Sequence, residues 1–268
     1  MIFLVIFIVV LLMLTEPIKR LLIFHPHKKI EMTPNWNYND FNVKTEDGET
    51  IHGWTIFPKK SNGKFILFSH GNAGNISHRI YFSNIFVMQG YTFIMYDYRG
   101  YGKSTGSPTE EGLFKDIEAV WKYMTKTLKI NSENIIIFGN SLGTSVSSHL
   151  VSKLQKQNIK YKCTILQSPF YSLKHLTSDL MPSILGVVSI FVKEFNTFQY
   201  LENNNKPILL IHSKGDELIP FKHSNQLLNN LKCNGKCYFD IFYIKGGHND
   251  PVLDYSYINK INMFVSLC

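Results

Sequence analysis

Short apolar runs alternate with longer stretches of helical character over most of this 268-residue chain. The alternation constrains the fold strongly, because a strand, a crossing helix and a second strand form the unit of a parallel sheet. We predict six strands, at Lys64 to Ser69, Thr92 to Tyr96, Asn134 to Phe138, Lys162 to Leu166, Pro207 to His212 and Tyr238 to Ile244. Helices are predicted at about Ile76 to Met88, Glu110 to Thr127, Leu142 to Gln155, Lys222 to Leu231 and Ser256 to Val265. The chain is therefore expected to form an α/β fold with a mainly parallel central sheet and helices on both faces.

Two segments depart from this alternation. Phe41 to Lys44 and Ile51 to Phe57 flank a turn sequence and predict an antiparallel hairpin. The gap from Ser168 to Tyr200 is longer than the others and contains the apolar stretch Met181 to Phe195. That stretch is either a plain packing helix or a small helical cap over a substrate pocket. We predict one domain, residues 25–268, with the cap segment at about 168–200.

The N-terminus begins with an unbroken apolar run, Met1 to Leu14, followed by Lys19-Arg20 and a second apolar patch, Leu21 to Phe24. The run is shorter than the roughly 20 residues that span a bilayer. A signal peptide, a buried core helix and a short signal-anchor are the alternatives, and we expect residues 1–24 to be an N-terminal membrane anchor, single-pass or interfacial. The basic residues after the run favour a cytoplasmic catalytic domain.

Charge and cysteine content exclude several classes of protein. The net charge of +8 is spread along the chain without basic clusters, so no nucleic-acid binding is predicted. The four cysteines have no metal-ligand spacing with a nearby histidine, and no metal or cofactor is expected. Cys233 and Cys237 flank a turn-like stretch and are either a local disulfide or free thiols.

The sequence Gly139-Asn140-Ser141-Leu142-Gly143 matches a nucleophile elbow, a sharp turn from strand to helix that exposes a serine. The apolar run before it and the helical stretch after it supply the required context. A serine hydroxyl needs a histidine base, and the base needs a carboxylate that fixes its tautomer. Asp216 follows one late predicted strand and His248 follows the last one, in the chain order that this elbow requires. We therefore predict Ser141, Asp216 and His248 as a catalytic triad.

Acyl transfer also needs two backbone N–H groups that face the developing oxyanion. The predicted strand ending at Ser69 runs into His70-Gly71-Asn72-Ala73-Gly74, and we assign one donor to the N–H of Asn72. The other donor is the N–H of Leu142, directly after the nucleophile. Nucleotide-binding glycine motifs are absent from this loop.

These residues resemble the α/β-hydrolase superfamily, and within it the membrane-anchored bud-emergence-related branch of the α/β-hydrolase domain-containing protein thirteen type. The resemblance extends from about Ile51 to the C-terminus and rests on the 70–79 loop, the segment Asp97 to Ser104, the elbow and His248-Asn249-Asp250. It implies an α/β-hydrolase fold, and it implies a catalytic domain on the non-cytoplasmic side, so the side of the membrane stays open. Asn140 stands where this branch often has Arg, and the cysteine-rich N-terminus of depalmitoylating relatives is absent.

We therefore expect a serine hydrolase that cleaves carboxylic esters or thioesters through an acyl-enzyme on Ser141. Its substrate would be an acyl-containing small molecule, a lipid or an acylated protein. The alternatives are a catalytically dispensable membrane scaffold with a hydrolase fold, and a serine peptidase of the same fold.

Overall fold

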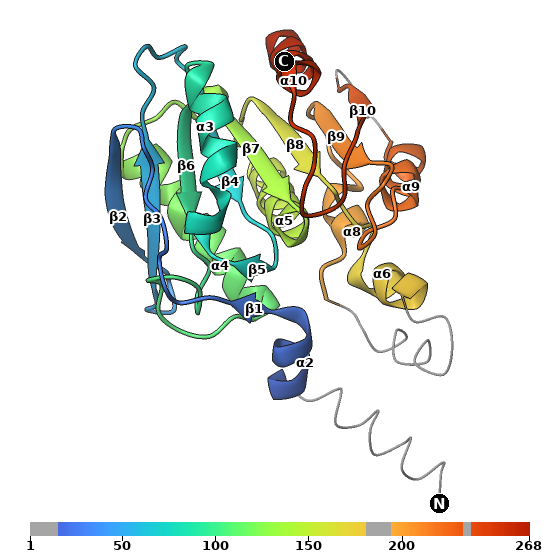
Figure 1. The fold of residues 1–268 in the computed structure, drawn as a ribbon, viewed down its shortest axis with the longest axis horizontal. Helices are drawn as coiled ribbons and strands as arrows, with labels where there is room; N and C mark the ends of the chain where they lie inside the picture. The colour runs from blue at the N-terminus through green and yellow to red at the C-terminus, as the bar shows by residue number, and fades with distance from the viewer. Residues whose placement is uncertain (1–15, 181–193, 233–236) are drawn as a thin grey trace, which may run out of the picture.

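An eight-stranded sheet forms the centre of the computed structural model, which describes residues 16–180, 194–232 and 237–268. The strand order is β10-β9-β8-β7-β4-β6-β3-β2 (Figure 1). The strands are β2 (Tyr38–Lys44), β3 (Thr50–Ile56), β4 (Phe65–Ser69), β6 (Thr92–Tyr96), β7 (Ile135–Asn140), β8 (Cys163–Gln167), β9 (Ile208–Ser213) and β10 (Phe239–Ile244). All six predicted sheet strands are present, and so is the predicted hairpin, as β2 and β3.

The sheet is parallel from β6 to β10 and antiparallel at the end that carries the hairpin. β2 pairs antiparallel with β3, and β3 pairs antiparallel with β6. The remaining neighbours pair in parallel, as expected for strands joined by crossing helices. The predicted α/β-hydrolase fold, with a mainly parallel sheet, is confirmed.

Side chains of the central strands alternate between two apolar cores, one on each face of the sheet. In β7, Ile135 and Ile137 belong to one core, whereas Ile136 and Phe138 belong to the other. This is the period of two that a strand imposes on its side chains. A strand buried on both faces therefore reads as a continuous apolar run in the sequence.

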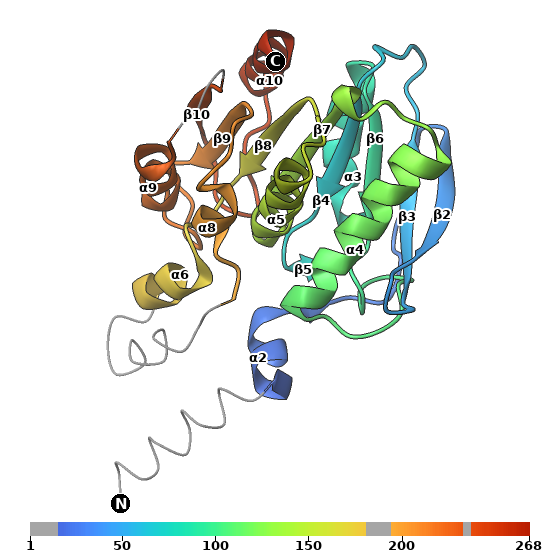
Figure 2. The same ribbon diagram turned by 180° about the vertical axis from the view of Figure 1, so that it is seen from behind.

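Helices cover both faces of the sheet, as Figures 1 and 2 show from opposite sides. α3 (Ile80–Met88) and α10 (Tyr255–Leu267) pack on one face. α4 (Glu110–Lys122), α5 (Leu142–Lys156), α8 (Thr197–Leu201) and α9 (Lys222–Asn230) pack on the other. Single turns extend some of them, at Ile76–Arg79 before α3 and at Tyr123–Thr127 after α4, and a further turn, Ser132–Asn134, precedes β7.

The predicted cap segment is described only at its two ends. α6 (Leu173–Leu180) begins it and α8 ends it, and residues 181–193 lie outside the described residues. α6 is tied to α9, because the Asp179 carboxylate lies 2.7 Å from Lys222 Nζ and 3.1 Å from His223 Nε2. Cys237 is disulfide-bonded and Cys163 and Cys268 are free thiols, whereas Cys233 lies outside the described residues.

The N-terminal segment requires a correction. Across the described part of the chain, no helix is both long enough and apolar enough to cross a membrane, so the predicted membrane location is wrong. Of the predicted anchor, residues 1–24, the structure describes α2 (Glu16–Ile23) and the residue that follows it. The apolar run Met1 to Leu14 itself lies outside the described residues. After α2, the two-residue strand β1 (His25–Pro26) pairs in parallel with β5 (Ala73–Gly74).

Candidate active site

The predicted site residues follow the carboxyl ends of four parallel strands, β4, β7, β9 and β10. These ends meet at one edge of the sheet, where ligands bind in open α/β folds. The 70–74 loop follows β4, Ser141 follows β7, Asp216 comes shortly after β9, and His248 comes shortly after β10. The structure therefore brings together residues that are up to 176 positions apart, from Asn72 to His248.

Ser141 lies on a sharp turn between β7 and α5, with a left-handed backbone at φ 52° and ψ −120°. The two flanking glycines are needed for close approach rather than for flexibility. A Cβ on Gly139 would lie 2.3 Å from the carbonyl oxygen of Gly143, and a Cβ on Gly143 would lie 2.0 Å from the carbonyl oxygen of Ser69. The G-x-S-x-G spacing thus lets α5 pack against β4 and β7 while Ser141 stays in a strained conformation.

His248 bridges the serine and the carboxylate. Its Nε2 lies 3.0 Å from Ser141 Oγ, and its Nδ1 lies 2.8 Å from Asp216 Oδ2. Two hydrogen bonds fix the loop that carries His248. The backbone N–H of His248 donates to Glu217 Oε2, and the N–H of Gly247 donates to Asp250 Oδ1. Asp250 therefore supports the histidine loop, and Asp216 is the carboxylate that contacts the imidazole.

Asp216 is surrounded by hydrogen-bond donors. Its Oδ1 accepts from the N–H groups of Leu218 and Ile219, at 3.0 and 2.7 Å. Burial by itself would raise the pKa of this carboxyl, but hydrogen bonds from His212 and His248 outweigh it and hold the pKa well below its usual range. An ionised Asp216 can only accept, so the proton of neutral His248 lies on Nδ1 and Nε2 faces Ser141 as a free base.

His212 is a partner of Asp216 that the sequence analysis did not identify. It lies in β9 with no exposed side-chain surface, and its Nε2 lies 2.8 Å from the carbonyl oxygen of Ile219 and 3.3 Å from Asp216 Oδ2. A carbonyl cannot donate, so Nε2 carries the proton and Nδ1 accepts from Ser224 Oγ at 2.6 Å. The available signal was its position four residues before Asp216, at the end of an otherwise apolar strand where a buried imidazole needs partners.

The two predicted oxyanion donors come from the start of α5 and from the loop that follows β4. Leu142 is the first residue of α5, so its N–H has no partner within the helix and lies at the positive end of the helix dipole. The loop that carries Asn72 passes close to the nucleophile, since a Cβ on Gly71 would lie 3.4 Å from Ser141 Cβ. Tyr101 holds the backbone of this loop, because its hydroxyl donates to the carbonyl oxygen of Asn72 at 2.8 Å.

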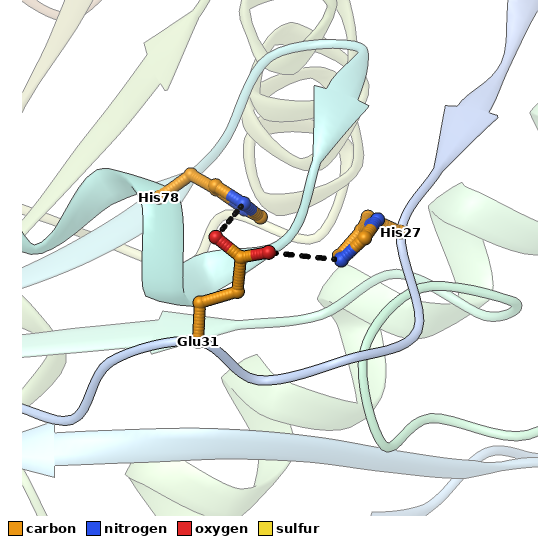
Figure 3. A group of neighbouring side chains, drawn as sticks. All are labelled: His27, Glu31 and His78. Carbon is orange, nitrogen blue, oxygen red and sulfur yellow. Dashed lines mark ion pairs between the residues drawn. The ribbon is translucent and has the colours of Figure 1, made fainter.

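One cluster of ionisable side chains near this loop has the composition of a metal site. Within the described ranges, His27, Glu31 and His78 form the only group of three such side chains whose ligand atoms lie close enough to share an ion. The Glu31 carboxylate lies between the two imidazoles, 3.4 Å from His27 Nε2 and 3.5 Å from His78 Nε2 (Figure 3). His78 Nδ1, however, accepts a hydrogen bond from the backbone N–H of Asn75 at 3.1 Å. The proton of neutral His78 therefore lies on Nε2 and points to Glu31, which favours a hydrogen-bonded pair over a metal ligand.

Solved structures share this fold at low sequence identity. The Pyrococcus furiosus esterase Pf2001 superposes with a TM-score of 0.73 at 18% identity, over 91% of this chain and 97% of that one. An α/β hydrolase from Vibrio vulnificus superposes with a TM-score of 0.71 at 20% identity, over 85% of this chain and 81% of that one. These likenesses establish the arrangement of strands and helices.

Sequence comparisons are more specific. Human α/β-hydrolase domain-containing protein 17B is 33% identical over 250 residues, which cover 87% of this chain and 79% of the relative. Protein R595 of Acanthamoeba polyphaga mimivirus is 34% identical over 261 residues, which cover 91% of this chain and 85% of the relative. The sequence model of the prolyl oligopeptidase family matches residues 77–260, a range that includes Ser141, Asp216 and His248. The chain belongs to the prolyl oligopeptidase family within the α/β-hydrolase superfamily, and it is a hydrolase.

Proposed function

We propose that this chain is a serine hydrolase that cleaves carboxylic ester or thioester bonds through an acyl-enzyme on Ser141. The observation that carries the proposal is the position of His248, within hydrogen-bond distance of both Ser141 Oγ and the Asp216 carboxylate. A buried, ionised carboxylate, an imidazole with a free Nε2 and a serine on a strained turn are the three parts that acyl transfer requires.

The proposed reaction begins when His248 Nε2 takes the proton of Ser141 Oγ, and the oxygen attacks the acyl carbonyl. Asp216 stabilises the imidazolium that forms, while the N–H groups of Asn72 and Leu142 donate to the oxyanion. His248 then protonates the leaving alcohol or thiol, and an acyl-enzyme remains on Ser141. Water, deprotonated by the same imidazole, releases the acid. No step requires a metal or a cofactor.

Activity-based labelling with a fluorophosphonate probe tests the proposal. We expect wild-type protein to be labelled and Ser141→Ala not to be. Ser147→Ala is a matched control, because Ser147 is a buried serine on the same helix, α5, and its variant should be labelled like wild type. Turnover of a p-nitrophenyl ester or an acyl thioester should fall about 10⁶-fold in Ser141→Ala. Unlabelled wild-type protein, or equal labelling of Ser141→Ala, would refute the proposal.

Peptide hydrolysis is the second candidate, and the match to the prolyl oligopeptidase family favours it. It uses the same nucleophile, base and oxyanion donors, so the choice depends on the leaving group. Parallel assays with ester, thioester and prolyl-peptide substrates separate the two, and a higher kcat/KM for the peptide than for both acyl substrates would reverse our preference.

We also propose that residues 25–268 form the hydrolase domain and that the segment 168–200 forms one wall of the substrate pocket. The described ends of this segment support the proposal, because α6 and α8 lie near the carboxyl end of β8 (Figures 1 and 2). The 70–79 loop and the segment Asp97 to Ser104 further support placement in the bud-emergence-related branch. Acyl chains of small molecules, lipids or acylated proteins are the proposed substrate class.

The third possibility is a hydrolase-fold scaffold in which catalysis is dispensable. Complementation of cells that lack the protein distinguishes this scaffold from an enzyme. Full rescue of cells lacking the protein by Ser141→Ala would support the scaffold.

A further inference from the structure

The 70–79 loop, which carries the proposed oxyanion donor Asn72, is held from outside by a distant part of the chain. Residues 25–31, which we call the N-terminal strap, run alongside it, and β1 in the strap pairs with β5 in the loop (Figure 1). The N–H of His27 donates to the carbonyl oxygen of Gly74 at 3.0 Å, and the N–H of His25 donates to Asn72 Oδ1 at 3.3 Å. The strap therefore contacts the loop at and directly after Asn72.

Asn75 is the central link between the strap and the loop, and it is fully buried although its side chain is polar. Its Nδ2 donates to two strap carbonyl oxygens, those of His27 at 2.9 Å and Lys29 at 2.7 Å. Its Oδ1 accepts from the N–H and the hydroxyl of Ser77, at 2.9 and 2.6 Å. The amide thus uses both of its N–H donors and both acceptor sites of its oxygen. If either the strap or Ser77 moved away, a buried polar group would be left without a hydrogen-bond partner.

Glu31 forms a second link at the far end of the strap. Its backbone N–H donates to Ser77 Oγ at 3.1 Å, and its carboxylate lies between His27 and His78 (Figure 3). The N–H on His78 Nε2 is directed to this carboxylate by the tautomer that Asn75 imposes. The ion pairs of Glu31 with His27 and His78 therefore hold the strap against the turn that follows β5, and we call them the clamp.

The inner side of the loop has its own supports. The hydroxyl of Tyr98 donates to the carbonyl oxygen of His70 at 2.7 Å, and Asp97 Oδ1 accepts from the N–H of Ile76 at 2.9 Å. Two further donors outside the strap hold the middle of the loop, since the Tyr101 hydroxyl donates to the carbonyl oxygen of Asn72 and Arg79 Nη2 donates to that of Ala73, each at 2.8 Å. The strap holds the same residues from the opposite side, by the pairing of β1 with β5. A loop held on one side only would let the Asn72 N–H deviate from the oxyanion.

We propose that the N-terminal strap is a positioning element for the oxyanion hole, with Asn75 and Glu31 as its positioning residues. This inference rests on the proposed serine-hydrolase function. The oxyanion exists only in the transition state and the tetrahedral intermediate, so a displaced Asn72 N–H lowers kcat without weakening ground-state binding of substrate.

Two variants of the full chain test the strap. Asn75→Asp keeps the size of the side chain but replaces the two-hydrogen donor by oxygen, which faces the carbonyl oxygens of His27 and Lys29. Glu31→Ala removes the clamp without touching the buried amide. Glu133→Ala is the matched control, because it removes an exposed carboxylate that is paired with Lys160 at 3.8 Å and lies outside the strap, the loop and the site.

We expect Asn75→Asp to lower kcat about 10- to 100-fold with KM nearly unchanged, since a misplacement near 1 Å costs about 10² in rate. Glu31→Ala should lower kcat less, and Glu133→Ala should behave like wild type. Affinity for a trifluoromethyl ketone analogue of the substrate, whose adduct with Ser141 places an oxyanion in the same hole, should fall by the same factor as kcat. Amide hydrogen exchange at residues 72–76 should become faster in both strap variants.

The outcomes separate this inference from the function on which it rests. Unlabelled, inactive wild-type protein would refute the serine-hydrolase proposal itself. Active wild-type protein with an unchanged kcat in Glu31→Ala and in folded Asn75→Asp would overturn the strap and leave the function intact. If Asn75→Asp does not fold, Glu31→Ala alone decides. A fall in thermal stability with unchanged kcat and unchanged ketone affinity would show a purely structural contact and would also overturn the proposal.

Discussion

His212 offers a sharp test of how the proposed catalytic carboxylate is held. The imidazole connects Ser224 Oγ on one side with Asp216 Oδ2 and the carbonyl oxygen of Ile219 on the other. Two amide substitutions separate these contacts, because each keeps the hydrogen-bonding group of one ring nitrogen. In His212→Asn the amide occupies the position of Nδ1 and keeps a partner for Ser224, but the donor to Asp216 is lost. In His212→Gln the longer side chain places an N–H near the position of Nε2 and keeps that donor.

The magnitude follows from the geometry. A hydrogen bond to a charged group contributes about 1.5–3 kcal/mol. The Nε2 to Oδ2 separation of 3.3 Å, and the sharing of the same N–H with Ile219, place this one at the weak end. We therefore expect His212→Asn to lower kcat/KM about tenfold, which corresponds to about 1.4 kcal/mol of transition-state stabilisation. His212→Gln should stay within about threefold of wild type.

The assay is ester hydrolysis measured as a ratio to wild type across pH. Loss of the His212 donor moves the pKa of Asp216 up toward its ordinary value, because one of the bonds that stabilise the carboxylate is gone. The relative activity of His212→Asn should therefore fall further as the pH decreases, whereas the ratio for His212→Gln should be flat. Equal kcat/KM values for the two variants at every pH would show that His212 does not act through Asp216.

Two further predictions concern packing and pH. Gly143→Ala places a Cβ 2.0 Å from the carbonyl oxygen of Ser69, so it should lower the free energy of unfolding by about 3 kcal/mol and reduce activity, measured by urea denaturation and ester turnover. Gly48→Ala is its control: the site is open but left-handed, at φ +92°, and should cost only about 1 kcal/mol; equal losses would contradict the close-approach argument. Burial lowers the pKa of His70 to about 4 from its ordinary 6.5, so the unfolded chain binds the proton more readily than the folded chain between these values. The stabilisation is complete above about pH 6.5 and is lost as the pH falls toward about 4, by about 3 kcal/mol in total. In His70→Asn, which keeps a donor to the carbonyl oxygen of Gly71, urea denaturation should show a flatter dependence on pH; an unchanged slope would contradict this assignment.

The sequence by itself determined the fold and the order of the proposed catalytic residues. Parallel strands buried on both faces are continuous apolar runs, and the loops that follow them contain Ser141, Asp216 and His248 at predictable positions. These features are local, since each motif includes its own strand and turn. The close approach of α5 to β4 and β7 also left a signal, because it requires Gly139 and Gly143 on either side of the serine.

Only the tertiary structure decided which additional groups support the site. His212 lies four residues before Asp216 in the sequence, but this spacing alone does not show that the carboxylate of Asp216 turns back onto the imidazole. The two-residue strands β1 and β5 are too short to have a periodic pattern, and their partners are backbone atoms that any residue provides. Asn75 likewise reads as an ordinary loop residue until the carbonyl oxygens of His27 and Lys29, more than 40 positions away, meet its amide. Contacts between distant backbone atoms depend on how the chain packs, so no residue pattern records them.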